Sequence, residues 1–225
     1  MLNPSQTPIQ ILNQISEDAK LQEAILHIKP GKFKRGPDDP IYVHRGYYTR
    51  MLKSFLTDYK LMNAILTDKK LQTRFFRVFG YEGEVDFTLY PQCWIRDLPL
   101  LQIGKMSYLG DGIVLGTNKV SIDQKTVKVG RITIGDHTII DQDCMLGYST
   151  HIGHHTAIGV RSCIGVKTHI GNNCRIAEIV NIGHCCNIGN DVSIGQVSAI
   201  GNFTTIADGT KIPAFSRIPP KSSIE

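Results

Sequence analysis

The stretch IVNIGHCCNIGND, residues 179–191, holds the side chains of this sequence that are best suited to chemistry. One histidine, His184, stands beside two cysteines, Cys185 and Cys186. An imidazole titrates near neutral pH and can take a proton from a hydroxyl or an amine, and a thiolate can act as a nucleophile. These residue types alone leave four interpretations open: a metal site, a disulfide, a nucleophile with its base, and a structural role.

The sequence around this stretch repeats with a period of six residues. An aliphatic residue stands at every sixth position from Ile134 to Ile218 without a gap. Gly follows most of these residues, and the fourth position after each is small, most often Thr, Ser, Cys or Val. A period of six fits neither an amphipathic helix nor one long half-buried strand. It fits a short strand and a tight corner, repeated into a solenoid whose aliphatic residues all point inward.

This repeat resembles that of the hexapeptide-repeat superfamily, [LIV]-G-x-x-[STAVC]-x. The resemblance implies a left-handed parallel β-helix with three hexapeptides per coil. It also implies a homotrimer with active sites at subunit interfaces and, for most members, acyl-CoA-dependent acyl transfer. The superfamily includes γ-type carbonic anhydrases and members that only bind or assemble, so an acyltransferase, a metal hydratase and a noncatalytic trimeric scaffold are all implied as alternatives.

The predicted fold class is therefore mainly β. We expect a left-handed parallel β-helix of about six coils over residues 101–220, with a short tail over residues 221–225. A helical N-terminal region over residues 1–84 and a connector over residues 85–100 precede it. Three further aliphatic positions before residue 118 are one residue out of register with the rest. Residues 118–131 are therefore expected to form an irregular coil or a protruding loop.

The N-terminal region carries helix signals. TPIQ, Thr7 to Gln10, offers an N-cap threonine, a first-turn proline and a reciprocal glutamine, and this helix is expected to stop by KPG at residues 29–31. A second apolar stripe at helical spacing covers residues 46–66, and a third helix is expected over residues 68–79. The apolar stripes are predicted to pack on the solenoid or on each other.

The net charge of +5 is concentrated near the N-terminus: residues 20–80 hold thirteen Lys or Arg against five Asp or Glu. Solvated helix faces explain this excess, and weak contact of basic amphipathic helices with an anionic membrane is the alternative. The sequence carries no nucleic-acid-binding signature, so no nucleic-acid partner is expected. No apolar window approaches the ~18 residues of a membrane span, and the N-terminus lacks signal-peptide features, so we expect a cytoplasmic protein.

The cysteines follow the repeat. Cys144, Cys174 and Cys186 occupy the small interior position, so they are predicted to fill the core without forming disulfides. Cys185 falls at a corner beside His184, but sequence neighbours rarely point at each other as a nucleophile and its base must.

The histidines of the repeat are candidate metal ligands. The γ-carbonic anhydrases place a second histidine five residues after the first, and Gly189 stands at that distance from His184. No metal is therefore expected. His151 and His169, eighteen residues apart, are expected to stack on adjacent coils, where a third histidine from a neighbouring subunit would complete a three-histidine zinc site.

The stretch HCCNIGN resembles the catalytic coil of the lipid A acyltransferases and of the sialic-acid and bacillosamine-type sugar acetyltransferases. Their general base is a histidine two residues after an inward aliphatic, in stretches such as HDCVIGD. The resemblance makes His184 the catalytic general base, with Cys186 at the position of the family's cysteine. Some of these enzymes have an acidic residue before the histidine, where this chain has Gly183. Any carboxylate that orients His184 must then come from Asp191, Glu178 or a neighbouring subunit.

The C-terminal TKIPAFSRIPPKSSIE resembles the end of many family members, which lies beside bound coenzyme A. Lys211, Arg217 and Lys221 are therefore the candidate cofactor-binding residues, as contacts for the phosphates of acetyl-CoA or another acyl-CoA. The predicted reaction moves an acyl group, most simply acetyl, to a hydroxyl or amine of a sugar or related small acceptor. Transfer would be direct, without a covalent intermediate.

Overall fold

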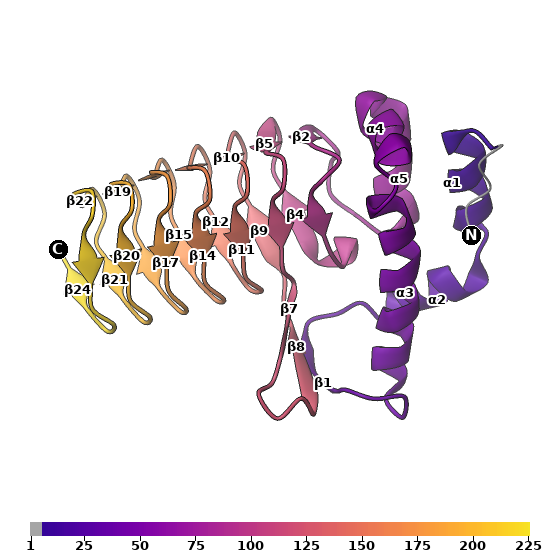
Figure 1. Ribbon diagram of the computed structural model, residues 1–225, viewed down its shortest axis with the longest axis horizontal. Helices are drawn as coiled ribbons and strands as arrows, with labels where there is room; N and C mark the ends of the chain where they lie inside the picture. Colours follow the sequence, from indigo (N-terminus) through magenta and orange to yellow (C-terminus); the bar gives the residue numbers. More distant parts are fainter. Residues whose placement is uncertain (1–5) are drawn as a thin grey trace.

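Among the residues that the structure describes, five α-helices precede a long β-solenoid (Figure 1). The computed structural model describes residues 6–225. Three parallel sheets of seven strands each form the three faces of the solenoid, and strand numbers within each sheet advance mostly by three. Residues that pair across a sheet, such as Ile140 with Ile158, lie eighteen positions apart, so each regular coil contains three hexapeptides. The predicted solenoid is confirmed.

The three faces are numbered in the order in which the chain first reaches them. The first face consists of β2 (Phe87–Leu89), β5 (Ser107–Leu109), β10 (Ile139–Ile140), β13 (Ala157–Ile158), β16 (Arg175–Ile176), β19 (Ser193–Ile194) and β22 (Lys211–Ile212). The second face consists of β3 (Trp94–Ile95), β6 (Val114–Leu115), β11 (Met145–Leu146), β14 (Cys163–Ile164), β17 (Asn181–Ile182), β20 (Ala199–Ile200) and β23 (Arg217–Ile218). The third face consists of β4 (Leu101–Ile103), β9 (Ile132–Ile134), β12 (His151–Ile152), β15 (His169–Ile170), β18 (Asn187–Ile188), β21 (Thr205–Ile206) and β24 (Ser223–Ile224).

The solenoid is longer than the expected six coils. Its first coil includes β2 and β3, which lie within residues 85–100, and its last strand, β24, lies within residues 221–225. The first coil lacks the regular Ile-Gly repeat, which is why the period did not reveal it. A short 3₁₀ turn, Leu98–Leu100, leads from β3 into β4.

The inner positions form a stacked hydrophobic core. The repeated aliphatic residues are nearly all buried, and Ile158, Ile170 and Ile188 are fully inaccessible. The small residue four positions later serves a second purpose: its hydroxyl or thiol donates to a carbonyl of the next coil. Thr156 Oγ1 donates to the Gly171 oxygen at 2.8 Å, and Cys186 Sγ donates to the Gly201 oxygen at 3.1 Å. These bonds satisfy buried polar groups where the coil turns.

The helical region contains α1 (Pro8–Ser16), α2 (Ala19–Leu26), α3 (Pro40–Leu56), α4 (Tyr59–Thr67) and α5 (Lys69–Val78). The capping box at Thr7 is confirmed. The single helix expected to run up to KPG is wrong, because the carboxylate of Asp18 accepts the Leu21 N–H and starts a second helix. Asp58 caps α4 in the same way and divides the second expected run. Aspartate at such a position competes with helix continuation by bonding the backbone locally.

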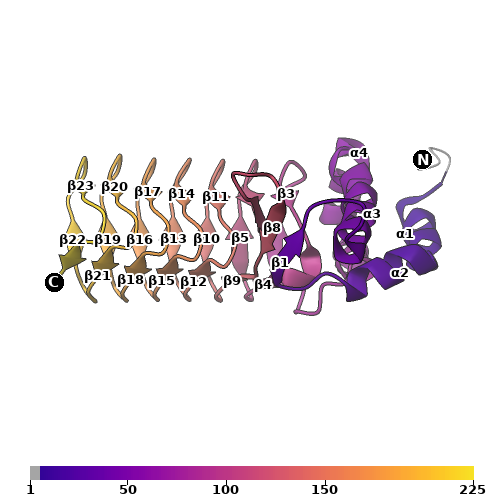
Figure 2. The same ribbon diagram turned by 90° about the horizontal axis from the view of Figure 1, so that it is seen from below.

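The helices pack on each other and on the first coil, as expected (Figure 2). Tyr48 of α3 is fully buried, donates its hydroxyl to the Phe79 oxygen and accepts the N–H of Leu98. Tyr81 donates to the Ile103 oxygen of β4, which joins the end of the helical region to the third face. Within residues 6–225, no helix has both the length and the apolar character needed to cross a bilayer.

Residues 118–131 form a protruding hairpin (Figure 1). Its strands are β7 (Asn118–Val120) and β8 (Thr126–Val129), and β8 also pairs with β1 (Gly31–Lys34). The resulting antiparallel sheet of three strands stands out from the side of the solenoid beside α3. It resolves the two alternatives for this segment in favour of the protrusion.

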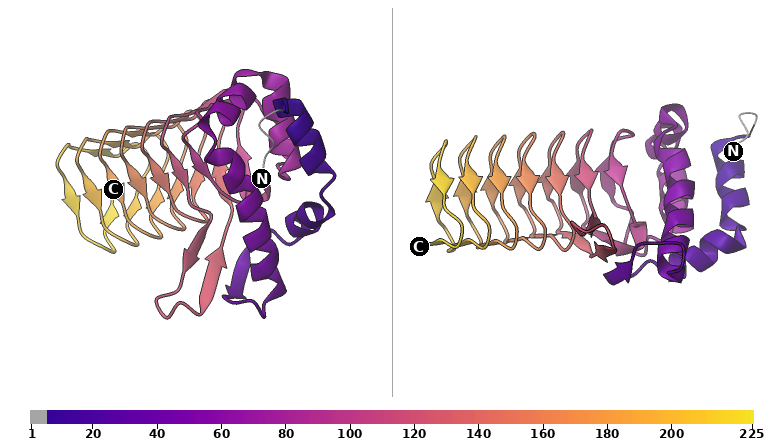
Figure 3. Two further views of the ribbon diagram at one scale, coloured as in Figure 1. Left: turned by 45° about the vertical axis from the view of Figure 1, so that its right-hand side comes forward. Right: turned by 60° about the horizontal axis from the view of Figure 1, so that its bottom comes forward.

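The coils are closely stacked (Figure 3), which leaves little room for a side chain at most of the repeat glycines, and Gly165 is one of these. A Cβ at Gly165 would lie 2.4 Å from the backbone oxygen of Gly183. We expect Gly165→Ala to lower the free energy of unfolding by about 1–3 kcal/mol, as overpacking against backbone does. Urea denaturation followed by circular dichroism measures this change.

Gly46 is the matched control. It lies inside α3, and a Cβ there would meet nothing within 4 Å. Gly46→Ala is expected to raise the free energy of unfolding by about 0.5–1 kcal/mol, since alanine has the higher helix propensity. Equal effects of the two substitutions would contradict the argument from coil spacing.

Candidate functional site

His184 lies at a corner between the second and third faces, after β17 and before β18. Its side chain is half-buried. The ring Nδ1 accepts the backbone N–H of Val166 at 3.1 Å, and the His184 N–H donates to Asn202 Oδ1 at 2.7 Å. His184 therefore belongs to a ladder in which one coil's side chain accepts the N–H of the coil before it.

The corner between the third and first faces carries a longer ladder of the same kind. His154 Nδ1 accepts the Asp136 N–H at 3.0 Å, and Asn172 Oδ1 accepts the His154 N–H at 2.8 Å. Asn190 and Asp208 continue it. Asn, Asp and His occupy equivalent positions because each offers an acceptor at the right reach. A histidine at this position of the repeat thus has a structural role whether or not it is catalytic.

The ladder bond fixes the tautomer of His184. Since Nδ1 accepts the Val166 N–H, the proton of the neutral ring resides on Nε2. In this state Nε2 is a hydrogen-bond donor. The ring must leave the Val166 N–H before Nε2 can receive a proton from an acceptor.

The two carboxylates considered as partners of His184 lie elsewhere in the coil. Glu178 follows β16 at the corner between the first and second faces, and Asp191 follows β18 at the corner between the third and first. Across residues 6–225, no hydrogen bond or ion pair joins the His184 ring to a carboxylate. Within one chain, neither candidate is positioned to orient it.

The candidate cofactor-binding cations divide between faces. Lys221 lies at the same corner as His184, two coils further on, which corresponds to about 10 Å at the ~4.8 Å spacing of paired strands. Arg217 begins β23 on the second face, directly before that corner. Lys211 begins β22 on the first face and is not part of this group. All three side chains are exposed.

Phe203 was missed by the sequence analysis. It lies at the corner between His184 and Lys221, its N–H donates to the His184 oxygen at 2.8 Å, and its side chain is 57% exposed. Its φ of 62° is in the left-handed region, which bulky residues rarely adopt. The signal available in the sequence was an aromatic residue three positions after a repeat isoleucine, where most other corners have polar residues; Phe215 has the same position in a different corner.

The cysteines behave largely as core residues. All six are free thiols. Cys144, Cys174 and Cys186 are buried as predicted, and burial raises the pKa of the Cys144 thiol to about 11. A raised pKa keeps the thiol protonated and unreactive at neutral pH. Cys185 is half-buried at the left-handed corner position, with φ of 57°.

His151 and His169 stack on adjacent strands of the third face as expected, with ring centroids 4.6 Å apart. Partial burial is the main cause that lowers the pKa of His151 below its usual value, and the nearby His169 and His154 lower it further. In the described part of the chain, no three His, Cys, Asp or Glu side chains gather in a way that could hold a metal ion. A three-histidine site would therefore need a ligand from another subunit.

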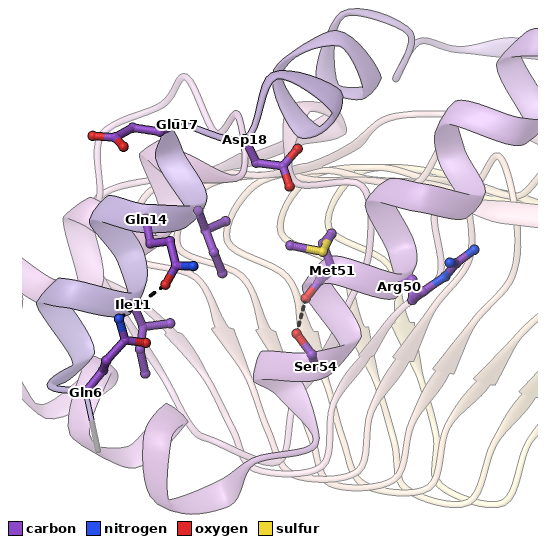
Figure 4. Close-up of a pocket in the computed structure, with 9 residues that line it drawn as sticks. Gln6, Ile11, Gln14, Glu17, Asp18, Arg50, Met51 and Ser54 are labelled. Carbon is purple, nitrogen blue, oxygen red and sulfur yellow. Dashed lines mark hydrogen bonds between the residues drawn. The ribbon is translucent and has the colours of Figure 1, made fainter. Parts of the chain in front are cut away.

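A pocket of about 550 Å³ lies in the helical region, between α1, the start of α2 and α3 (Figure 4). Its polar walls include Glu17, Asp18 and Arg50. The Asp18 carboxylate is already engaged: it caps α2 and accepts the hydroxyl of Tyr47 at 2.7 Å. The pocket contains none of the candidate residues named from the sequence.

Comparison with known proteins yields matches to solved structures only. No family model matches the chain, and no curated protein matches it in sequence. UDP-N-acetylglucosamine O-acyltransferase from Moraxella catarrhalis is 19% identical, with a TM-score of 0.36, over 64% of this chain and 63% of that one. A GDP-perosamine N-acetyltransferase variant from Caulobacter crescentus, in complex with CoA and GDP-perosamine, is 17% identical, with a TM-score of 0.27, over 69% of this chain and 61% of that one.

A third similar structure, serine acetyltransferase isoform 3 from Entamoeba histolytica in complex with cysteine, is 13% identical, with a TM-score of 0.18, over 96% of this chain. The chain spans about three fifths of the length of each of these three proteins. The fold assignment rests on the chain's own repeat and its three parallel sheets, which make it a hexapeptide-repeat β-solenoid.

Proposed function

We propose that the protein is an acyl-CoA-dependent acyltransferase that moves an acetyl or other acyl group to a hydroxyl or amine of a sugar or related small acceptor. One observation carries the proposal: His184, the exposed ring of Phe203, Arg217 and Lys221 gather around a single corner of the solenoid. A base, an apolar platform and cations for phosphate are the parts that transfer from coenzyme A requires. The proposed setting is the cytoplasm, whose reducing conditions suit six free cysteines.

In the proposed reaction, the acceptor oxygen or nitrogen attacks the thioester carbonyl while its proton passes to His184 Nε2. The carbon–sulfur bond then breaks, and the proton passes from Nε2 to the departing thiolate of coenzyme A. No covalent enzyme intermediate forms. Before the attack, the ring gives up its hydrogen bond from the Val166 N–H and exchanges protons with water to reach the Nδ1–H tautomer, which frees the Nε2 lone pair for the acceptor's proton. Giving up one such bond costs on the order of 1 kcal/mol, which substrate binding can offset.

The proposal includes a homotrimer. Asp191 and Glu178 lie at other corners of the same chain, so the carboxylate that orients His184 is assigned to a neighbouring subunit. Arg217 and Lys221 are assigned to the phosphates of coenzyme A, because an exposed cation beside the base can hold a phosphate without burial of charge. Lys211 lies on the first face and would contact the cofactor only if that cofactor belonged to the next subunit.

The catalytic role of His184 can be tested separately from its structural role in the ladder. Asparagine occupies the equivalent ladder position at Asn172, Asn190 and Asn202, so His184→Asn retains an acceptor for the Val166 N–H. We expect this variant to keep its thermal stability and to lose general-base catalysis, a loss of about 10²–10⁴-fold in thioester turnover. Release of coenzyme A, followed with a thiol reagent, measures turnover.

Two further variants control this experiment. His154→Asn makes the same change in the other ladder and is expected to leave turnover unchanged. His184→Ala removes the acceptor, so the Val166 N–H loses its partner and stability should fall by about 1–3 kcal/mol as well. Full turnover in His184→Asn would rule out His184 as the base.

The cofactor assignment predicts unequal effects of the three C-terminal cations. We expect the double variant Arg217→Gln, Lys221→Gln to raise the Kd for coenzyme A by at least about tenfold, the loss of one charge-assisted hydrogen bond being enough for that. Lys211→Gln, on the first face, is expected to have a smaller effect, which arises only if its side chain reaches a cofactor bound to the next subunit. Isothermal titration calorimetry measures the Kd of the unchanged protein and of both variants. Unchanged affinity in the double variant would contradict the assignment.

A further inference from the structure

A second pocket, of about 370 Å³, lies where α3, the hairpin and the first coil of the solenoid meet. The proposed acyl transfer does not use it. Its walls include Arg35, Arg45, Arg96, Tyr42 and Asn118. The three arginines come from different elements: Arg35 follows β1, Arg45 belongs to α3, and Arg96 follows β3.

Two of these arginines are held in place by neutral partners. Arg96 Nη1 donates to Asn118 Oδ1 at 2.9 Å, and its guanidinium lies over the Trp94 ring, 5.4 Å from the centroid. Arg35 Nη1 donates to Gln124 Oε1 at 3.3 Å. Within residues 6–225, neither side chain forms an ion pair. Both guanidiniums are therefore positioned while their charge stays unbalanced.

Arg45 supplies a buried donor. The residue is 7% exposed and pairs with Asp97, yet its Nε is buried without a hydrogen-bond partner. Asp97 also accepts the hydroxyl of Thr117 at 2.6 Å, and its second oxygen is likewise unpartnered. A buried donor without a partner is uncommon in native proteins and is a place where a ligand atom or water belongs. The pocket lining holds three arginines and no carboxylate among the described residues, and Asp97 balances only Arg45, so the pocket is positively charged.

The hairpin sheet adds to this charge. Lys32, Lys128 and Lys119 lie directly opposite one another on β1, β8 and β7, and all three are exposed. None of them forms an ion pair with a described residue. Like charges opposite each other disfavour strand pairing. Since strand side chains alternate, these lysines share one face of the sheet, while the pocket residues Val120 and Val127 lie on the other. The resulting positive potential would attract an anion to this end of the molecule.

We propose that this pocket binds a small molecule carrying a phosphate monoester. Guanidinium groups match phosphate oxygens in pairs, and a dianion would balance the two arginines that lack a carboxylate. The volume exceeds what one phosphate needs, and the Val120 and Val127 side chains offer an apolar wall for the attached group. The site is distinct from His184: three strand spacings separate β6, which precedes Asn118, from β17, or about 14 Å.

The binding test uses the full chain with inorganic phosphate and with glucose 6-phosphate, titrated by calorimetry at low and moderate salt. We expect saturable binding that weakens as salt rises. Arg96→Gln and Arg35→Gln should each raise the Kd about tenfold or more, and Arg96→Lys should fall between them and the unchanged protein, since lysine keeps the charge without the planar fork. Arg45 is left intact because it also anchors Asp97.

Arg175→Gln is the matched control, since Arg175 is an exposed arginine on the first face with no ion pair to a described residue. Its Kd for either probe should be unchanged. Absence of saturable binding to both probes and to vesicles, or equal weakening by Arg175→Gln and Arg96→Gln, would overturn the proposal.

Binding to lipid vesicles distinguishes a lipid headgroup from a soluble phosphate ester as the ligand. Phosphatidylcholine vesicles containing phosphatidic acid present a phosphate monoester, and vesicles containing phosphatidylserine present anionic charge without one. Arg96-dependent binding to the first kind of vesicle alone assigns the site to a lipid headgroup. Binding confined to the soluble probes assigns it to a soluble phosphate ester. Equal binding to both kinds of vesicle, with no Arg96 dependence, would show a charge effect of the lysine face and contradict the pocket assignment.

Discussion

The hydrogen bonding between successive coils is the constraint on which the rest of this structure depends. Each coil must satisfy the backbone of the one before it at a fixed spacing of about 4.8 Å. That spacing explains the repeat position by position. Isoleucine fills the interior, glycine follows because a Cβ at Gly165 would meet the backbone of Gly183, and the small residue donates to a carbonyl of the next coil, as Thr168 does to Gly183.

The same constraint determines how much chemistry the repeat can carry. At the position of His184 the fold requires only a side chain that accepts a backbone N–H, and Asn202 is that acceptor on the following coil. The residue before each isoleucine points outward, so it can vary without disturbing the packing of the core. Corner residues in the left-handed conformation are exposed as well, but bulky ones there carry strain. Phe203 adopts this conformation, as Phe215, Ile179 and Val197 do at other corners, so its place beside His184, and not its strain, associates the exposed ring with the candidate site.

The sequence predicted the solenoid because the core repeats at a fixed period, and it predicted the buried role of Cys186 for the same reason. The divided helices escaped prediction because a single aspartate, Asp18 or Asp58, ends one helix and caps the next within an otherwise continuous apolar pattern. The arginine pocket has no sequence signal at all. Arg35 and Arg96 meet there only because β1 pairs with the hairpin, and no repeat connects them.

The two ends of the solenoid are protected by different means, and this bears on both proposals. At the N-terminal end the helical region covers the first coil, with Tyr81 and Phe76 packed against Phe87 of β2. Toward the C-terminus, Pro219, Pro220 and the nearby exposed cations discourage pairing of the strands there with another sheet. Arg217 and Lys221 would therefore be useful there without any cofactor. Edge protection requires only charge, whereas phosphate binding also requires position, so a difference between Lys221 and Lys211 would reflect binding rather than protection.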